Sequence, residues 1–324
     1  MEIRLQKGIH LPGCDLWLDS QRKVPFGVVT HAHSDHAGWH GITVATPATV
    51  ALMKVRRQPP AGTIIHELPF WKPFQTPQAT ITLIPAGHIL GSAQVLIETK
   101  EGRLLYTGDF KRRESLTCEQ SKTVKADTLV MECTFGLPIY AFPPAEHVHQ
   151  QIIKFCGRVL VSGETPVLLA YSLGKSQELM AILSKASITP VVHESIARMS
   201  AVYEEQGVEL GSYSIWDGTN HKGRVMIIPP NATKRMEKLK NHRTAIVSGW
   251  AMDSSAIYRY QCDEAFALSD HADHGELIEH VEEVGAKMVY LVHGFTEEFA
   301  GDLRYFGIDA LALGGRNQLE LLFD

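Results

Sequence analysis

Four side chains that can bind a metal ion stand within six residues, directly after a short β-branched run. The run at residues 27–30 predicts a strand, and the donors that follow it are His31, His33, Asp35 and His36. Because side chains at i and i+2 of extended backbone point the same way, the two histidines of the H-x-H pair can share one ion, and the Asp-His pair can turn toward a second. A solvated polar loop is the alternative. The density of donors favours a strand that ends in a metal-binding loop.

Three later segments repeat this form, with a donor at the end of an apolar run. The donors are His88, Asp109 and His293, and each stands beside a glycine, which lets backbone turn sharply and approach an ion closely. A single histidine of this kind is more often structural. Together with the first loop, the three donors complete a set of ligands. The chain has 16 histidines and only 5 cysteines, which agrees with a site built from imidazole, the commonest metal ligand.

Length and composition limit the class of protein. A chain of 324 residues predicts two lobes, and 44% hydrophobic with 21% charged residues is ordinary for a globular protein, which excludes a disordered, collagen-like or disulfide-dense chain. The formal net charge of -5 provides no overall positive field for nucleic acid. Any nucleic-acid binding would therefore use local patches.

The cysteines and the apolar runs predict a compartment. The five thiols are odd in number and lack a C-x-x-C pair, which is typical of packing residues in a reducing environment; they are Cys14, Cys118, Cys133, Cys156 and Cys262. The chain has no run of about 18 apolar residues and no apolar signal segment near Met1. We therefore expect a cytoplasmic protein with no membrane partner.

The spacing of the predicted elements indicates an insertion. Closely spaced β-branched runs in the first half predict strands in antiparallel or mixed sheets; they lie at 27–30, 79–84, 93–98, 103–106 and 128–131. From about residue 145 strands and helices alternate, as in an α/β lobe. A strand at 245–250 is predicted to return to the first lobe. We therefore expect one domain from residues 1–145 and 245–324, with residues 146–244 inserted as a smaller lobe.

The ligand set resembles the metallo-β-lactamase superfamily, whose fold is an αβ/βα sandwich. The resemblance implies two divalent metal ions, zinc in the first place and manganese as an alternative. It implies that His31, His33 and His88 hold the first ion, that Asp35, His36 and His293 hold the second, and that Asp109 bridges them. A site of this kind alone leaves the substrate open.

Further segments resemble the β-CASP branch of that superfamily, nucleases with an inserted lobe. Glu132, in M-E-C-T-F-G, resembles the acid of motif A, and His271, in S-D-H-A-D, resembles the histidine of motif B. A carboxylate bound to one ring nitrogen raises the basicity of the other, so the two form a candidate acid-base pair. A buried ion-pair acid and a helix cap are the alternatives. The predicted catalytic residues are Asp35, Glu132 and His271.

Three cations are candidates for phosphate contacts. Lys175 follows Gly174 at the predicted start of a helix, where an anion can bind, although a solvated lysine at a helix start explains it equally well. Lys111 and Arg112 directly follow Asp109 and could meet phosphates beside the site.

Within the branch, the phrases at 85–94, 108–112 and 134–138 are most similar to the bacterial ligase-associated DNA exonucleases, and residues 248–250 resemble Artemis-type repair nucleases. The resemblance implies a metal-dependent DNA exonuclease of DNA repair, acting 5′ to 3′ on single strands or DNA ends, with a DNA ligase and a helicase as partners. Glu132 and His293 instead match the RNA 3′-end processing nucleases, so RNA is the alternative substrate. A small-molecule metallo-hydrolase or a non-catalytic scaffold ranks below both.

Overall fold

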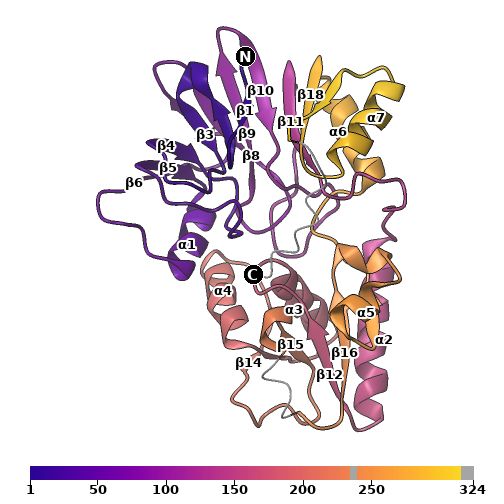
Figure 1. Cartoon of the computed structure of the whole chain (residues 1–324). Helices are drawn as coiled ribbons and strands as arrows, with labels where there is room; N and C mark the ends of the chain where they lie inside the picture. Colours follow the sequence, from indigo (N-terminus) through magenta and orange to yellow (C-terminus); the bar gives the residue numbers. More distant parts are fainter. Residues whose placement is uncertain (234–238, 315–324) are drawn as a thin grey trace. The chain divides into compact units, whose positions relative to one another are not determined.

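The computed structural model describes residues 1–233 and 239–314, which fold as two compact units (Figure 1). Unit 1 consists of Met1–Ala141 and of the described residues from His271 onward, and unit 2 of the described residues within Phe142–Asp270. The helices of the described part of the chain do not combine the length and the apolar character that a membrane crossing requires.

The first sheet of unit 1 has six strands in sequence order. They are β1 (Arg4–Leu5), β2 (Ile9–Leu11), β3 (Leu16–Leu18), β4 (Phe26–Val28), β5 (Ile42–Ala45) and β6 (Ile64–Glu67). The pairs from β1 to β3 are antiparallel and those from β3 to β6 are parallel. A 3-10 turn (Pro12–Cys14) lies between β2 and β3, and helix α1 (Pro47–Arg56) connects β5 to β6.

The second sheet of unit 1 has seven strands in the order β19-β18-β11-β10-β9-β8-β7. They are β7 (Pro73–Gln75), β8 (Thr80–Pro85), β9 (Ala93–Thr99), β10 (Gly102–Tyr106), β11 (Thr128–Cys133), β18 (Met288–Gly294) and β19 (Ala310–Ala312). The pairs from β7 to β10 are antiparallel, and those from β10 through β11 and β18 to β19 are parallel. The prediction of antiparallel or mixed sheets in this part of the chain is confirmed.

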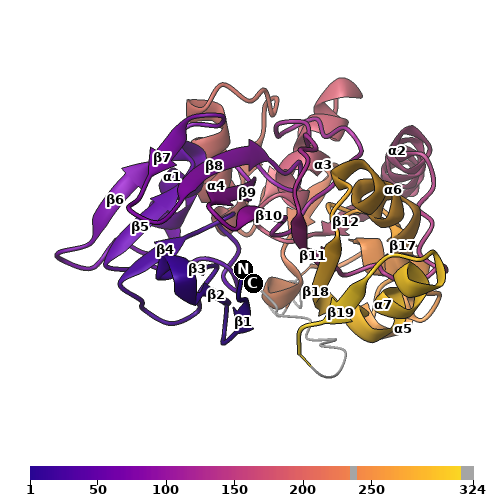
Figure 2. The same ribbon diagram turned by 90° about the horizontal axis from the view of Figure 1, so that it is seen from above.

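Side chains alternate between two cores along the central strands of the second sheet. In β11, Val130 packs with residues of the first sheet, whereas Leu129 and Met131 pack against helices α6 (His274–Val284) and α7 (Thr296–Tyr305). Figure 2 shows α7 beside β19. Because adjacent side chains of a strand point to opposite faces, one sheet can bury both of its sides. Unit 1 is therefore the predicted αβ/βα sandwich.

Unit 2 is an α/β fold around a six-stranded sheet whose pairs are all parallel. The strand order is β14-β13-β15-β12-β16-β17, with bounds β12 (Thr165–Leu169), β13 (Val191–Val192), β14 (Ser214–Ile215), β15 (Met226–Ile228), β16 (His242–Val247) and β17 (Glu264–Phe266). Its helices are α2 (Ala145–Val161), α3 (Lys175–Lys185), α4 (Glu194–Glu205) and α5 (Ala256–Tyr260), with a 3-10 turn at Gly249–Met252.

The inserted unit extends further along the chain than the predicted end at residue 244. The strand expected to return to the first domain is β16, and it pairs with β12 and β17 in the sheet of unit 2. The chain re-enters unit 1 at His271, and the last ten residues of the predicted third segment lie outside the described residues. An apolar run predicts a strand, but only its hydrogen-bonding neighbours determine which sheet it joins.

Candidate metal centre

The candidate ligands of the second sheet meet at one edge because their strands point the same way. Strands β10, β11 and β18 are parallel, and β8 shares their direction because β9 is antiparallel to both β8 and β10. His88 and Asp109 follow the ends of β8 and β10, while Glu132 and His293 lie in the last residues of β11 and β18. The carboxyl ends of parallel strands are where sheets of this kind place their sites.

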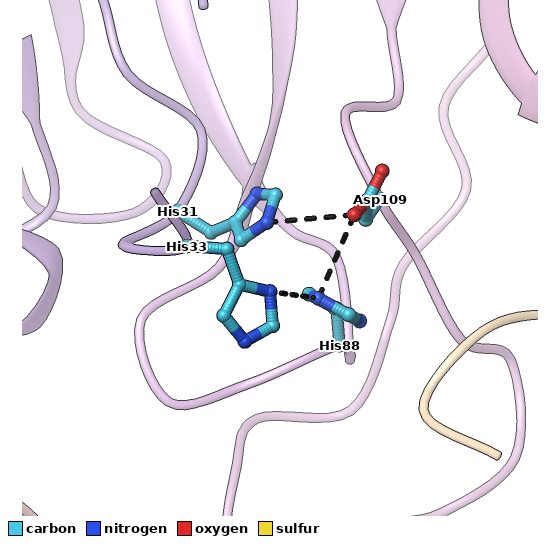
Figure 3. Close-up of side chains that lie close together, drawn as sticks. All are labelled: His31, His33, His88 and Asp109. Carbon is cyan, nitrogen blue, oxygen red and sulfur yellow. Dashed lines mark hydrogen bonds and ion pairs between the residues drawn. The ribbon is translucent and has the colours of Figure 1, made fainter. Parts of the chain in front are cut away.

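The first group of ligands contains His31, His33, His88 and Asp109 (Figure 3), with donor atoms all within 4.8 Å of one another. Asp109 Oδ2 lies 3.5 Å from His31 Nε2 and 3.7 Å from His88 Nε2, and His33 Nδ1 lies 3.0 Å from His88 Nε2. Three imidazoles and one carboxylate converging in this way form a donor set that suits zinc.

The second group faces the other oxygen of the same carboxylate. His36 Nε2 lies 3.5 Å from Asp109 Oδ1 and 3.5 Å from Asp35 Oδ2, and the ring centroids of His36 and His293 are 5.3 Å apart. Each oxygen of Asp109 is therefore turned toward a different group of donors. This is the arrangement that a carboxylate needs in order to bridge two ions.

The protonation pattern of the rings fits a bound cation. His31 Nε2 is buried and has no hydrogen-bond partner among the described residues, although it points at Asp109. On the other side of the ring, Nδ1 lies 3.0 Å from Thr30 Oγ1, whose own hydrogen goes to Asp19 Oδ2 at 2.7 Å. His31 must then donate from Nδ1, which leaves the lone pair of Nε2 directed into the site.

Asp19 is a functional residue that sequence reasoning missed. It is buried, and its carboxylate accepts hydrogen bonds from the Thr30 amide at 2.8 Å, from the Tyr106 hydroxyl at 3.0 Å and from His36 Nδ1 at 2.9 Å. It thereby turns Nε2 of His36 toward the metal ligands. Its sequence pattern is the same as that of the predicted ligands, a donor at the end of an apolar strand, because Asp19 directly follows β3.

Burial and neighbouring charges shift the pKa values of the residues in the centre. Burial raises the pKa of Asp109 to about 7, against the opposing effect of His36 and with a further increase from Glu132. For His36, burial would lower the pKa, but Asp109, Asp35 and Asp19 together hold it well above its usual value. The pKa of His31 is lowered well below its usual value by burial and then by the neighbouring histidines. Because burial disfavours the ionised form of Asp109, a bound cation would stabilise this carboxylate.

The structure brings Glu132 and His271 together beside these ligands. His271 Nδ1 lies 2.8 Å from Glu132 Oε1, which also accepts the Phe110 amide at 3.0 Å, and Glu132 Oε2 accepts both the amide and the hydroxyl of Thr134. Burial would raise the pKa of Glu132, which is 1% exposed, but the charge and hydrogen bond of His271 outweigh it and lower the pKa. The carboxylate is thus ionised and fixes the direction of the His271 ring.

The structure places the two predicted phosphate contacts that follow Asp109 in a buried and in an ion-paired position. Lys111 is only 2% exposed. Arg112 Nη1 and Nη2 donate to the two carboxylate oxygens of Glu283 at 2.8 and 2.7 Å, and Thr123 lies next to the same guanidinium. The acidic partner of Arg112 is 171 residues further along the chain, so the local sequence does not reveal this ion pair.

Lys175, the third predicted phosphate contact, is 1% exposed within unit 2. Its ammonium lies 3.3 Å from Glu178 and 3.7 Å from Asp270, so two carboxylates balance its charge. The alternative of a solvated lysine is also wrong. The arrangement of Lys175 between two carboxylates is typical of a buried structural ion pair and does not favour binding of an anion.

Comparison with known proteins identifies relatives of the chain, although no family model matches it. It is 43% identical over 324 residues to a protein of Opitutus terrae named "Probable DNA ligase", a match that covers 99% of this chain and 32% of that protein. It is 25% identical over 213 residues to an RNase J-like protein of Methanocaldococcus jannaschii, covering 57% of this chain and 51% of the relative. It is 36% identical over 123 residues to cleavage and polyadenylation specificity factor subunit 3 of Dictyostelium discoideum, covering 35% and 15%. The chain thus spans about a third of the first of these relatives and half of the second.

A solved structure has a similar fold. The crystal structure of a protein of unknown function from Enterococcus faecalis aligns with a TM-score of 0.58 over 90% of this chain and 80% of its own, at 13% identity. The order of the ligands along the chain, the sandwich interrupted by an α/β unit and the relatives agree with one another. The chain belongs to the metallo-β-lactamase superfamily, in its β-CASP branch.

Proposed function

We propose that the protein is a metal-dependent nuclease that hydrolyses phosphodiester bonds. The observation that carries the proposal is the carboxylate of Asp109, which faces a donor group with each oxygen and lies in one cluster with Glu132 and His271. Relatives named RNase J-like protein and endoribonuclease support the same class of reaction. Two divalent ions fit the two donor groups, and zinc suits the nitrogen-rich first group best.

The residues of the chain divide the chemistry between them. Divalent ions would be held by His31, His33, His88 and Asp109 and by Asp35, His36 and His293; they would lower the pKa of a water molecule toward ~7 and supply positive charge for the phosphate oxygens. Asp35, whose side chain is 34% exposed beside His36, orients the attacking water by accepting a hydrogen bond. Glu132 holds Nδ1 of His271, so Nε2 is the atom that gives a proton to the leaving oxygen. Such proton transfer contributes about 10² to 10⁴ in rate.

The role of His271 is tested by replacing it with alanine. The variant should keep its bound metal and lose about 10² to 10⁴ in turnover, since the proton donor is removed while the ligand set stays. Metal content by elemental analysis and turnover of an oligonucleotide are measured on the same sample. Wild-type turnover in this variant would refute the assignment.

DNA is the substrate that we propose. The relative with 43% identity is named a probable DNA ligase, and the matched region makes up 32% of it. A nuclease region carried on one chain with a ligase would act on the same broken DNA. This supports a 5′ to 3′ exonuclease on single strands or DNA ends, working in repair beside a DNA ligase and, by the family resemblance, a helicase.

The deciding experiment uses single-stranded DNA and RNA of matched sequence, labelled at either end, with added zinc or manganese. Stepwise loss of nucleotides from the 5′ end of DNA is expected. Asp109→Ala is the control, and it should bind less metal and release no product. Stepwise loss from the 3′ end would reverse the proposed polarity.

RNA processing is the second candidate, because Glu132 and His293 match the motifs of RNA-cleaving nucleases and several relatives are named endoribonucleases. Internal cuts confined to RNA in the same experiment would establish it in place of the DNA exonuclease. Cleavage of nitrocefin or lactoylglutathione with both nucleic acids intact would instead indicate a small-molecule hydrolase. Metal binding without turnover of any of these substrates would indicate a scaffold.

A further inference from the structure

Two consecutive arginines that follow the bridging carboxylate are both bound to helix α6. Arg112 pairs with Glu283 near the end of the helix. Arg113 Nη2 lies 3.0 Å from Glu276 Oε2 and 4.0 Å from Asp273 Oδ2, at the start of the helix. The segment that carries Asp109 is therefore fastened along α6 at two places.

The attachment at the start of α6 lies beside the segment that carries His271. Arg113 Nη2 also approaches the carbonyl oxygen of His271 at 3.4 Å, and the amide of Ala272 donates to the carbonyl of Phe110 at 2.8 Å. Residues 109–113 and 271–276 are thus joined by backbone and side-chain contacts. The first of these segments begins with Asp109, the proposed bridging carboxylate, and the second begins with His271, the proposed proton donor.

The acidic partners of Arg113 are themselves held in place. Asp273 and Glu276 form a capping box, in which the Asp273 carboxylate accepts the Glu276 amide at 3.0 Å and the Glu276 carboxylate accepts the Asp273 amide at 3.0 Å. A capping box defines the first turn of a helix. Arg113 therefore binds a rigid structure, and its position is transmitted to the residues just before the helix.

We propose that Arg113 is a positioning residue, which holds His271 at the correct place relative to Asp109. A guanidinium presents several donors in one plane, so it can reach a carboxylate and a carbonyl at the same time. The proposal rests on the proposed function, because it assigns to Arg113 the placement of the group that protonates the leaving oxygen. Arg112, bound two turns further along α6, has only a stabilising role.

The experiment compares two substrates that differ in their need for a proton donor. The p-nitrophenolate of bis(p-nitrophenyl) phosphate leaves without protonation, whereas the alkoxide leaving group of an oligonucleotide needs a proton. The variants are Arg113→Met, Arg113→Lys and Glu276→Gln, the last of which keeps an acceptor for the capping box. Glu283→Gln is the matched control, since it weakens the other arginine pair on the same helix.

A displaced His271 should lower kcat only on the substrate whose leaving group needs a proton. Arg113→Met and Glu276→Gln should lower kcat on the oligonucleotide by about 10² while metal content, KM and turnover of the activated diester stay close to wild type. Arg113→Lys should recover part of the loss, and Glu283→Gln should behave as wild type. An equal loss on both substrates, or no loss on either, would overturn the proposal. If the wild-type protein cleaves neither substrate, the proposed function fails instead.

Discussion

The side chains at the centre of this protein depend on neighbours that fix which ring nitrogen carries the proton. Asp19 accepts from Nδ1 of His36, Thr30 accepts from Nδ1 of His31, and Glu132 accepts from Nδ1 of His271. For His31 and His36, the opposite nitrogen lies 3.5 Å from a carboxylate oxygen of Asp109. Supporting groups of this kind set both the orientation and the basicity of a ligand.

Replacing Asp19 with asparagine should weaken metal binding without unfolding the protein. The amide keeps the size of the side chain, but it removes the negative charge beside His36 and offers one acceptor oxygen instead of two. We expect metal affinity to fall about 10- to 100-fold. Titration against a competing chelator measures the affinity, and excess metal should restore turnover. Asp15→Asn, at an exposed position in the turn before β3, is the control; equal affinities of the two variants would contradict the role of Asp19.

At the scale of elements, an irregularity between two parallel strands shapes the site. The register of β11 against β18 shifts between Glu132 and Cys133, so that Cys133 pairs with Gly294. At the same place His293 has φ +58 and Gly294 has φ +82. Bulges re-aim side chains, and strained backbone conformations are enriched at active sites and ligand-binding sites. The irregularity thus lies directly at Glu132 and at His293, the predicted acid and the predicted metal ligand of the two strands.

Gly294→Ala should disrupt this irregularity. A Cβ at Gly294 would collide with the Cys133 carbonyl, and the positive φ adds strain. We expect a loss of about 1 to 3 kcal/mol in the free energy of unfolding, together with weaker metal binding as His293 shifts. Gly301→Ala in α7 is the control, because its added Cβ would meet nothing within 4 Å beyond its chain neighbours and the backbone of its own helix. Urea unfolding and metal titration give the two quantities, and matching results for the two variants would exclude a special role for Gly294.

Helix α6 carries a buried histidine that should make stability depend on pH. Burial first, and Arg112 second, lower the pKa of His280 to about 3. In the unfolded chain the ring titrates near 6.5, so below that pH the unfolded state binds a proton that the folded state does not. The stability that this ring contributes is therefore complete above pH ~6.5 and is lost as the pH falls toward ~3.

His280→Phe should remove this dependence, because phenylalanine does not titrate and can keep the contact with the Phe110 ring, whose centroid lies 4.6 Å from that of His280. Between about pH 6.5 and about pH 5, the wild type should lose about 2 kcal/mol more than the variant in the free energy of unfolding. Urea titrations at both pH values, with a chelator in every sample, measure the difference. Parallel pH curves for the two proteins would argue against a neutral buried His280.

At the scale of the whole molecule, the candidate ligands all belong to unit 1 although the sequence of that unit is interrupted. His31 through Glu132 precede the insertion, whereas His271 and His293 follow it. The sheet of unit 2 has its own core, formed by residues such as Val167, Met226 and Ile246. Metal binding and the folding of unit 2 are therefore expected to be largely separate.

Removal of metal should lower the local stability of unit 1 and leave that of unit 2 unchanged. Ions that bind only the folded state stabilise it by mass action, and here they would join loops that follow several different strands. After chelation, amide hydrogen exchange should speed up around His31–His36, His88 and Asp109, while β12 and β16 keep their protection. Mass spectrometry of peptides resolves the two units in one sample. Equal loss of protection in both would show that the units are coupled.

Much of the site could be anticipated from local pattern. A donor directly after an apolar strand is visible in the sequence, and the structure places His31, His88 and Asp109, which share this form, in one group. Asp19 has the same form but stands outside any recognisable ligand motif. Its role depends on His36, 17 residues later, and on Tyr106, 87 residues later.

The sequence by itself determined the type of donor, the positions of several strands and the presence of an inserted α/β unit, because these follow from side-chain chemistry and from the period of the apolar residues. Only the tertiary structure decided which sheet strand β16 joins and which cations are already neutralised. Lys111 and Arg112 resemble solvent-exposed phosphate contacts in the sequence, but in the structure Lys111 is buried and Arg112 is paired with Glu283. The physical reason is that burial and ion pairing depend on residues far away along the chain, which a local pattern does not specify.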